Sequence, residues 1–151
     1  MNIEITNIEK SDIPNIFEIN KTSNLTFWSE NQFLSELVQE SEFNLKLQID
    51  DRKIIGFIFS SFIVDNLNIN NICILPEHQH KGFGSLILNH SLLKARKKNG
   101  KKAFLEVRSI NFKALKLYQK FGFIIDTTRR NYYANGDDAV LMSLDLSLLN
   151  L

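Results

Sequence analysis

The chain has 151 residues, of which 44% are hydrophobic and 23% charged, and its formal net charge is +1 at pH 7. This length and composition are typical of one globular domain and exclude a disordered or collagen-like chain. A single cysteine, Cys73, excludes a disulfide framework and an all-cysteine zinc site. We therefore expect one domain over residues 1–151.

The near-neutral total conceals two oppositely charged halves. Residues 1–76 carry a net charge of −6 and residues 77–151 a net charge of +7. The basic half suits a polyanionic ligand, and the acidic half suits a cationic one. The N-terminus lacks a signal-peptide pattern, and the longest apolar run, 54–59, is far below the roughly 18 residues that cross a bilayer. We expect a soluble, cytoplasmic protein with no membrane partner.

The first half of the chain predicts one strand, two helices and then three strands. Ser11 and Asp12 are predicted to cap the first helix, with Pro14 in its first turn, and residues 29–32 form a capping box for the second. Alternating and apolar runs predict the strands, with a turn at Asp50–Asp51 between two of them. The predicted strands cover residues 3–8, 43–49, 54–64 and 67–75.

The second half predicts two helices and three strands. Gly100 and Gly122 are placed to end the helices. The predicted helices cover 82–99 and 111–120, and the strands 103–108, 123–126 and 139–146. The resulting order, β-α-α-β-β-β-α-β-α-β-β, predicts an α+β fold with helices on the faces of a mixed sheet.

A glycine-containing loop joins the strand at 67–75 to the helix at 82–99. Successive backbone N–H groups and a helix N-terminus make such a loop suitable for a pyrophosphate. A Walker motif is absent, and Ile87 stands where a dinucleotide fingerprint needs its third glycine. The glycine pair alone is also compatible with an ordinary turn at the start of a helix that binds no ligand.

Two motifs in this half belong together. The first is Gln79-x-x-Gly82-x-Gly84, and the second is Leu105-Glu106-Val107-Arg108-x-x-Asn111-x-x-Ala114-x-x-Leu117-Tyr118-x-x-Phe121-Gly122-Phe123. Together they resemble the acetyl-coenzyme A signature of the GNAT superfamily of N-acetyltransferases. The form Leu-Glu-Val-Arg, with Arg129-Arg130-Asn131-Tyr132-Tyr133, Asp138-Ala139 and Met142, is similar to the ribosomal-protein-alanine N-acetyltransferase (RimI-type) branch. The match covers residues 72–142, and Phe27-Trp28-Ser29 with Phe33 resembles the N-terminal segment of that branch more faintly.

The resemblance implies the GNAT fold, a mixed sheet of six to seven strands with splayed central strands and about four helices. It implies acetyl-CoA as cofactor, with the pyrophosphate on the glycine loop and the pantetheine arm between residues 72–74 and 103–107. The implied cofactor-binding residues are Ile72, Cys73, Ile74, Gln79, His80, Lys81, Gly82, Phe83, Gly84, Ser85, Asn111 and Tyr118.

Acetyl transfer to an amine needs proton management. The attacking amine is protonated at pH 7 and requires a base, while the departing thiolate benefits from an acid such as a tyrosine hydroxyl. The resemblance implies Glu106 as the base and Tyr118 as the acid. The pattern alone favours an exposed carboxylate beside Arg108 and a core tyrosine with a solvated hydroxyl.

For the acceptor, the resemblance implies the N-terminal α-amine of a protein, with small-subunit ribosomal protein 18 as the substrate. The implied acceptor-side residues are Trp28, Arg108, Tyr132 and Tyr133. A lysine side chain or a small amine (a polyamine or an aminoglycoside) remains an alternative, as does a non-catalytic acetyl-CoA-binding module. The chain has Asn66 where this branch usually has an acidic residue.

Two further features predict little chemistry of their own. His78 and His80 lack a cysteine or carboxylate at ligand spacing, so we expect no metal, and Cys73 is expected to be a buried strand residue rather than a nucleophile. The basic run at 94–102 favours a solvated helix end; no interleaved aromatics support nucleic-acid readout, although a face touching RNA or the ribosome remains open.

Overall fold

The computed structural model describes residues 1–23, 26–38, 41–50 and 52–149. Its contacts group the chain into two compact units, the first comprising Met1–Ser61 with Asn70–Ser91 and the second Phe62–Ile69 with Leu92–Leu151. The expectation of a single domain stays a prediction. No helix in the described ranges combines the length and apolar character that a bilayer crossing requires.

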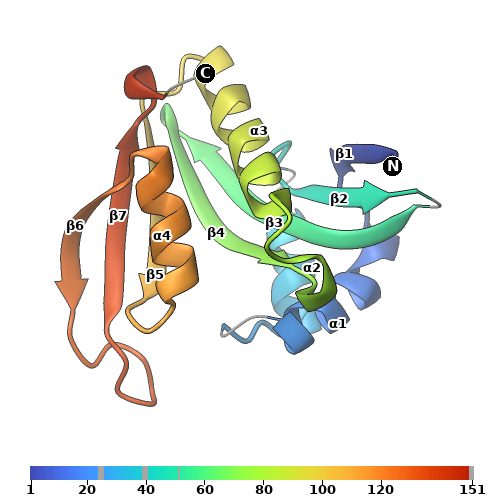
Figure 1. Cartoon of the computed structure of the whole chain (residues 1–151), viewed down its shortest axis with the longest axis horizontal. Helices are drawn as coiled ribbons and strands as arrows, with labels where there is room; N and C mark the ends of the chain where they lie inside the picture. Colours follow the sequence, from blue (N-terminus) through green and yellow to red (C-terminus); the bar gives the residue numbers. More distant parts are fainter. Residues whose placement is uncertain (24–25, 39–40, 51, 150–151) are drawn as a thin grey trace. The chain divides into compact units, whose positions relative to one another are not determined.

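The elements follow the predicted order (Figure 1). The strands are β1 Ile3–Asn7, β2 Leu45–Ile49, β3 Lys53–Ile63, β4 Asn66–Ile74, β5 Lys102–Arg108, β6 Ile124–Arg129 and β7 Ala139–Asp145. The helices are α1 Ile13–Ser23, α2 Glu30–Val38, α3 Phe83–Lys97 and α4 Phe112–Phe121. The strands form one mixed sheet in the order β1-β2-β3-β4-β5-β7-β6, which confirms the predicted α+β fold. The splay of the central strands stays a prediction.

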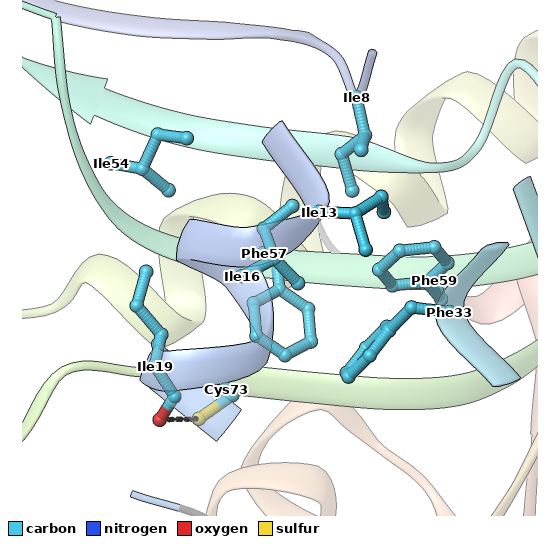
Figure 2. Packing of buried hydrophobic residues seen from close by; sticks show 9 residues of the cluster. All are labelled: Ile8, Ile13, Ile16, Ile19, Phe33, Ile54, Phe57, Phe59 and Cys73. Carbon is cyan, nitrogen blue, oxygen red and sulfur yellow. Dashed lines mark hydrogen bonds between the residues drawn. The ribbon is translucent and has the colours of Figure 1, made fainter. Parts of the chain in front are cut away.

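The first unit has a core rich in aromatic and branched side chains. Figure 2 shows isoleucines of α1 directed toward phenylalanines of β3 and α2. The Phe33 ring lies 5.7 Å from that of Phe57 and 5.2 Å from that of Phe59. Such aromatic pairs add to the stabilisation that burial of their area supplies.

The starts of α1 and α2 differ in how far they match the prediction. The capping box of α2 is confirmed: the Ser29 Oγ accepts the Gln32 N–H at 3.1 Å, and the Gln32 side chain accepts the Ser29 N–H at 2.9 Å. The predicted cap at Asp12 is wrong for α1. A 3₁₀ turn over Lys10–Asp12 precedes the helix, and Asp12 instead accepts the N–H of Glu9 at 2.8 Å and pairs with Lys46 at 2.6 Å. Of the predicted turn at Asp50–Asp51, Asp51 lies outside the described residues.

In the second unit, β5 pairs with the start of β4 in parallel and with β7 in antiparallel register, while β6 pairs with β7 at the edge (Figure 1). The strand predicted at 123–126 begins one residue later and runs to Arg129, because its pairing with β7 continues to Ala139. Val64 and Asp65 both have positive φ, as a two-residue hairpin turn demands, and Asn66 follows them as the first residue of β4.

Candidate active site

The glycine loop of the first unit is folded back onto the strand that precedes it. Gln79 Nε2 donates to the Ile74 carbonyl oxygen at 2.9 Å. His80 and Gly82 have φ values of 63° and 87°, so the chain turns through two left-handed positions immediately before α3. A Cβ at Gly82 would meet nothing within 4 Å; this position favours glycine for its backbone conformation and not for space.

The start of α3 offers backbone donors to an anion. The first hydrogen bond of the helix runs from the Leu86 N–H to the Gly82 carbonyl. The N–H groups of residues 83–85 therefore have no partner within the helix, and its dipole favours negative charge at this end. This donor set fits the pyrophosphate of coenzyme A. The Phe83 side chain is buried against the His78 ring, so only its backbone could contribute.

On β4, the side chains of the expected pantetheine-binding residues Cys73 and Ile74 are buried. The Cys73 Sγ lies 3.9 Å from the Ile19 carbonyl oxygen of α1 (Figure 2). Burial raises the pKa of this thiol from its ordinary 9.0 to about 12. The expectation of a buried strand cysteine is confirmed, and a protonated buried thiol is a poor nucleophile. Any role of Cys73 and Ile74 toward a ligand therefore belongs to their backbone, whereas Ile72 is half-buried.

The second unit places Glu106 on the exposed face of β5. The neighbouring residues Leu105 and Val107 are buried, as the predicted alternation requires. Glu106 Oε2 accepts a hydrogen bond from the Tyr133 hydroxyl at 2.8 Å. The structure thus brings together one predicted catalytic residue and one predicted acceptor-side residue.

The Arg108 side chain packs on the face of the Tyr133 ring, next to the Tyr133–Glu106 hydrogen bond. Its Cζ lies 3.8 Å from the Tyr133 ring centroid, which is cation–π distance. Its Nη1 lies 3.3 Å from Asp137 Oδ2 and 3.2 Å from Asn135 Oδ1. The guanidinium thus holds Tyr133 and the turn between β6 and β7. The expected contact of Arg108 with the acceptor stays a prediction.

Tyr133 donates to Glu106 as a protonated hydroxyl. Its pKa is raised above the ordinary value by partial burial first, and then by the hydrogen bond and charge of Glu106. The turn that carries it is closed by its own hydrogen bonds, from the Tyr133 N–H to the Asp137 carbonyl at 3.1 Å and from the Gly136 N–H to the Tyr133 carbonyl at 2.9 Å. Sequence reasoning missed Asn135 and Asp137. The Asn135-Gly136 pair is a turn signal that could have drawn attention to them.

In the same unit, Tyr118 lies in α4 and Asn111 is the residue that precedes this helix. Tyr118 is 5% exposed, and its ring meets that of Phe123 edge-on at 5.8 Å. Burial raises the pKa of Tyr118 well above its ordinary value, so the hydroxyl stays protonated. The Asn111 Oδ1 accepts the Ala114 N–H at 3.2 Å and caps α4. Its carboxamide oxygen is therefore occupied by the hydrogen bond that caps the helix, and its Nδ2 is the group suited to donate to a ligand.

The aromatic segment before α2 divides its two rings between core and surface. Trp28, the expected acceptor contact, packs on Phe33 and Phe59 at 5.1 Å and 5.8 Å. Phe27 is 67% exposed, with only an edge contact to Phe17 at 6.3 Å among the described ring pairs. Sequence reasoning chose Trp28 and did not choose Phe27. Hydropathy cannot separate two adjacent aromatic residues outside a regular element.

Tyr132 is half exposed, and its ring lies 5.3 Å from that of Tyr133 and 5.5 Å from the Arg129 guanidinium.

Of the remaining residues expected to bind the cofactor, His80 and Lys81 are exposed, whereas Gly84 and Ser85 are half-buried. Within the described ranges, no three His, Cys, Asp or Glu side chains gather in a way that could hold a metal ion.

Comparison with known proteins identifies the family to which this chain is similar. A sequence model of the acetyltransferase (GNAT) family matches residues 5–123. The chain is 32% identical over 148 residues to the [ribosomal protein bS18]-alanine N-acetyltransferase of Escherichia coli K12, spanning 95% of this chain and 98% of that protein. It is 36% identical over 143 residues to the protein of the same name from Haemophilus influenzae, spanning 92% and 96%.

Solved structures agree with the sequence match. The crystal structure of the Escherichia coli ribosomal-protein-S18-alanine N-acetyltransferase superimposes with a TM-score of 0.88 at 30% identity, covering 99% of this chain and 97% of that one. Arabidopsis thaliana Naa50, solved with the bisubstrate analogue CoA-Ac-MVNAL, shares the fold with a TM-score of 0.84 at 22% identity, covering 96% and 99%. The family model matches most of the chain, and the order of the strands and the loop before α3 agree with that match. This chain therefore belongs to the GNAT family of acetyl-CoA-dependent N-acetyltransferases.

Proposed function

We propose that this chain acetylates the N-terminal α-amine of a protein by direct attack of the amine on acetyl-CoA. The observation that carries the proposal is the Tyr133–Glu106 hydrogen bond of 2.8 Å, which holds a carboxylate at an exposed position of β5. The names of the bacterial relatives support a ribosomal protein with an N-terminal alanine as the acceptor. The cytoplasmic location expected from the sequence is part of this proposal.

Acetyl-CoA, when bound, supplies the thioester carbonyl that the amine attacks and the thiolate that leaves. The backbone N–H groups of residues 83–85, at the N-terminus of α3, are proposed to bind its pyrophosphate. The backbone of residues 72–74 and the Nδ2 of Asn111 are proposed to hydrogen-bond the amide groups of its pantetheine arm. The exposed Lys81 adds positive charge beside the loop.

Glu106 is proposed to remove the proton from the acceptor ammonium, directly or through one water. An ammonium group cannot attack a carbonyl, so this step creates the nucleophile. The Tyr133 hydroxyl keeps the Glu106 carboxylate in one orientation until the acceptor arrives. The acceptor ammonium can replace that hydroxyl, because it forms a charge-assisted hydrogen bond with the carboxylate and adds the attraction between opposite charges.

Tyr118 is proposed to stabilise the departing sulfur. Because its pKa is raised by burial, the hydroxyl keeps its proton until negative charge develops on the sulfur. It then donates a hydrogen bond to that charge, which is the kind of interaction that favours a transition state over the ground state.

The acceptor is the part of the proposal that kinetics must test. The −6 net charge of residues 1–76 suits a cationic acceptor, such as an arginine-rich ribosomal peptide. The discriminating experiment compares three acceptors by thiol release: a peptide with a free N-terminal alanine, the same peptide N-terminally blocked with an internal lysine, and spermidine. We expect the free-alanine peptide to react fastest.

Equal or faster reaction of the blocked lysine peptide or of spermidine would overturn the α-amine assignment. A reaction without enzyme provides the baseline for non-enzymatic acetylation. Tight acetyl-CoA binding without transfer to any of the three acceptors would support a binding module in place of an enzyme.

A further inference from the structure

A carboxamide side chain lies buried in the apolar face of α1. Asn20 is 1% exposed, in the same helix whose Ile13, Ile16 and Ile19 build the core of the first unit. A buried carboxamide destabilises the fold unless its donors and acceptor are hydrogen-bonded. The partners of Asn20 therefore indicate which segments it holds together.

Two hydrogen bonds connect Asn20 to other segments of the first unit. Asn71 Nδ2 donates to Asn20 Oδ1 at 3.2 Å, and Asn71, on β4, is itself buried. Asn20 Nδ2 donates to the backbone carbonyl oxygen of Thr26 at 3.1 Å. The Asn20–Asn71 pair thus connects β4 to the segment 26–29 that leads into α2.

One anchored end adjoins residues proposed to bind the cofactor arm, and the other contains Trp28, which the family resemblance implies for the acceptor side. On β4, Asn71 immediately precedes residues 72–74, whose backbone is proposed to bind the cofactor arm. In the segment 26–29, Thr26 immediately precedes the exposed Phe27, and Trp28 on its other side is packed on Phe33. Phe27 is thereby held between a hydrogen-bonded carbonyl and a packed indole.

We propose that Asn20 is a positioning residue: its carboxamide, oriented by Asn71, sets the position of the segment 26–29 and so presents this segment to the acceptor. The inference rests on the proposed function for its kinetic part and on the geometry of the first unit alone for its structural part. Glu106 and Tyr118 belong to the second unit, so we expect the change to fall on acceptor binding and not on the chemical step.

Asn20→Asp is the discriminating variant. It keeps the shape of the side chain and an oxygen that can accept from Asn71, but it removes the donor to Thr26. Asn44→Asp is the matched control, because Asn44 is also buried in the first unit and also joins a helix to a strand. Its Nδ2 donates to the Glu36 carbonyl at 3.3 Å, and its Oδ1 accepts the Ser60 N–H at 3.1 Å.

Trp28 is the only tryptophan in the chain, so its fluorescence reports on this segment without any need for activity. We expect Asn20→Asp to increase acrylamide quenching of Trp28 and to raise KM for the alanine peptide about 10-fold, a factor typical of one lost buried hydrogen bond. KM for acetyl-CoA should stay within about 2-fold, as expected when only acceptor binding is affected. Asn44→Asp should lower the melting temperature without changing Trp28 quenching or the peptide KM.

Equal changes of quenching and peptide KM in both variants would mean that Asn20 is merely structural, and would overturn the proposal. An unchanged peptide KM in Asn20→Asp alongside normal wild-type activity would overturn it as well. If Asn20→Asp does not fold, Asn71→Ser removes the bond that orients Asn20 and keeps the carboxamide of Asn20, and the same two readouts apply. If the wild type acetylates no peptide, the proposed function fails, but selective quenching in Asn20→Asp still supports the positioning of the segment and its absence still refutes it.

Discussion

The Tyr133 hydroxyl donates to Glu106 Oε2 over 2.8 Å, while the Arg108 guanidinium lies 3.8 Å from the centre of the same ring. The ring is held on its face by a cation that is itself bound to Asp137, and its hydroxyl is aimed at the proposed base. The proposed base and two residues assigned to the acceptor side thus form one connected group.

Tyr133→Phe removes the hydroxyl and keeps the ring. A hydrogen bond to a charged group contributes about 1.5–3 kcal/mol, so we expect kcat/KM for the alanine peptide to fall roughly 10- to 100-fold. Steady-state kinetics of Tyr133→Phe and Tyr133→Leu separate the hydroxyl from the ring, since only the second variant also loses the contact with Arg108. Wild-type kinetics in Tyr133→Phe would show that Glu106 needs no partner.

Glu106→Gln removes the proposed base but keeps an oxygen for Tyr133. General-base catalysis contributes about 10²–10⁴-fold, and we expect kcat to fall by that factor with little change in acetyl-CoA affinity. The remaining rate should rise with pH up to about 8, as more of the α-amine loses its proton in solution. A pH–rate profile of the same shape as wild type would exclude the base role. Asp126→Asn, an exposed carboxylate on β6, is the control.

Tyr118→Phe tests the proposed donor to the leaving sulfur. We expect kcat to fall roughly 10-fold or more, the loss of one donor to a developing charge, with the acetyl-CoA dissociation constant unchanged. Because burial raises the pKa of Tyr118, its hydroxyl stays protonated, and wild-type kcat should show no alkaline loss from this group up to about pH 10. Isothermal titration with acetyl-CoA, beside kinetics, separates the two effects. Parallel losses of binding and turnover would leave Tyr118 as a packing residue.

Asp137→Asn tests whether Arg108 positions Tyr133. The Asp137–Arg108 pair is partly exposed, with side chains 19% and 18% accessible, so we expect less than about 1 kcal/mol of lost stability. The loss in kcat/KM should be several-fold, because Tyr133 is no longer held, and it should be non-additive with Tyr133→Phe. A double-mutant cycle measures this coupling. Full additivity would mean that Asp137 acts independently of the tyrosine.

Burial of the Cys73 thiol should make the folded protein less stable at alkaline pH. Its pKa is raised from 9.0 to about 12 by burial, so above pH 9 the unfolded chain releases the thiol proton while the folded chain retains it. Stability must therefore fall as pH rises, by about 1.4 kcal/mol between neutral pH and pH 10. Urea unfolding of the wild type and of Cys73→Ala at increasing pH should show the curves converging. Parallel curves would contradict the burial of the thiol.

Local chemistry made several features predictable. The Ser29–Gln32 capping box depends on two residues three apart, and both of its hydrogen bonds are present. Gly122 ends α4 with φ at 102°, a conformation that glycine adopts without steric cost. The alternation of β5 placed Glu106 on the face opposite the core, since successive strand residues point to opposite sides.

The functional assignments needed the long motif as well as local pattern. Gln79-x-x-Gly82-x-Gly84 and the run from Leu105 to Phe123 indicated the family, and the family match and the sheet order confirm it. The role of Asp12 was mispredicted because its competing partner, Lys46, lies 34 residues away. No local pattern contains such a partner.

The charge count, the order of elements and the family motifs were determined by the sequence itself, because each depends on neighbours along the chain. The sequence also indicated a carboxylate on the open face of β5, whereas the partner of that carboxylate was decided only by tertiary structure. Tyr133 reaches Glu106 from 27 residues away because a closed turn and the Arg108–Asp137 pair hold it there. Likewise, the helix around Asn20 does not indicate that its side chain is hydrogen-bonded to Asn71, which lies 51 residues away along the chain. Hydrogen bonds are directional and short in range, so only folding decides which distant groups meet.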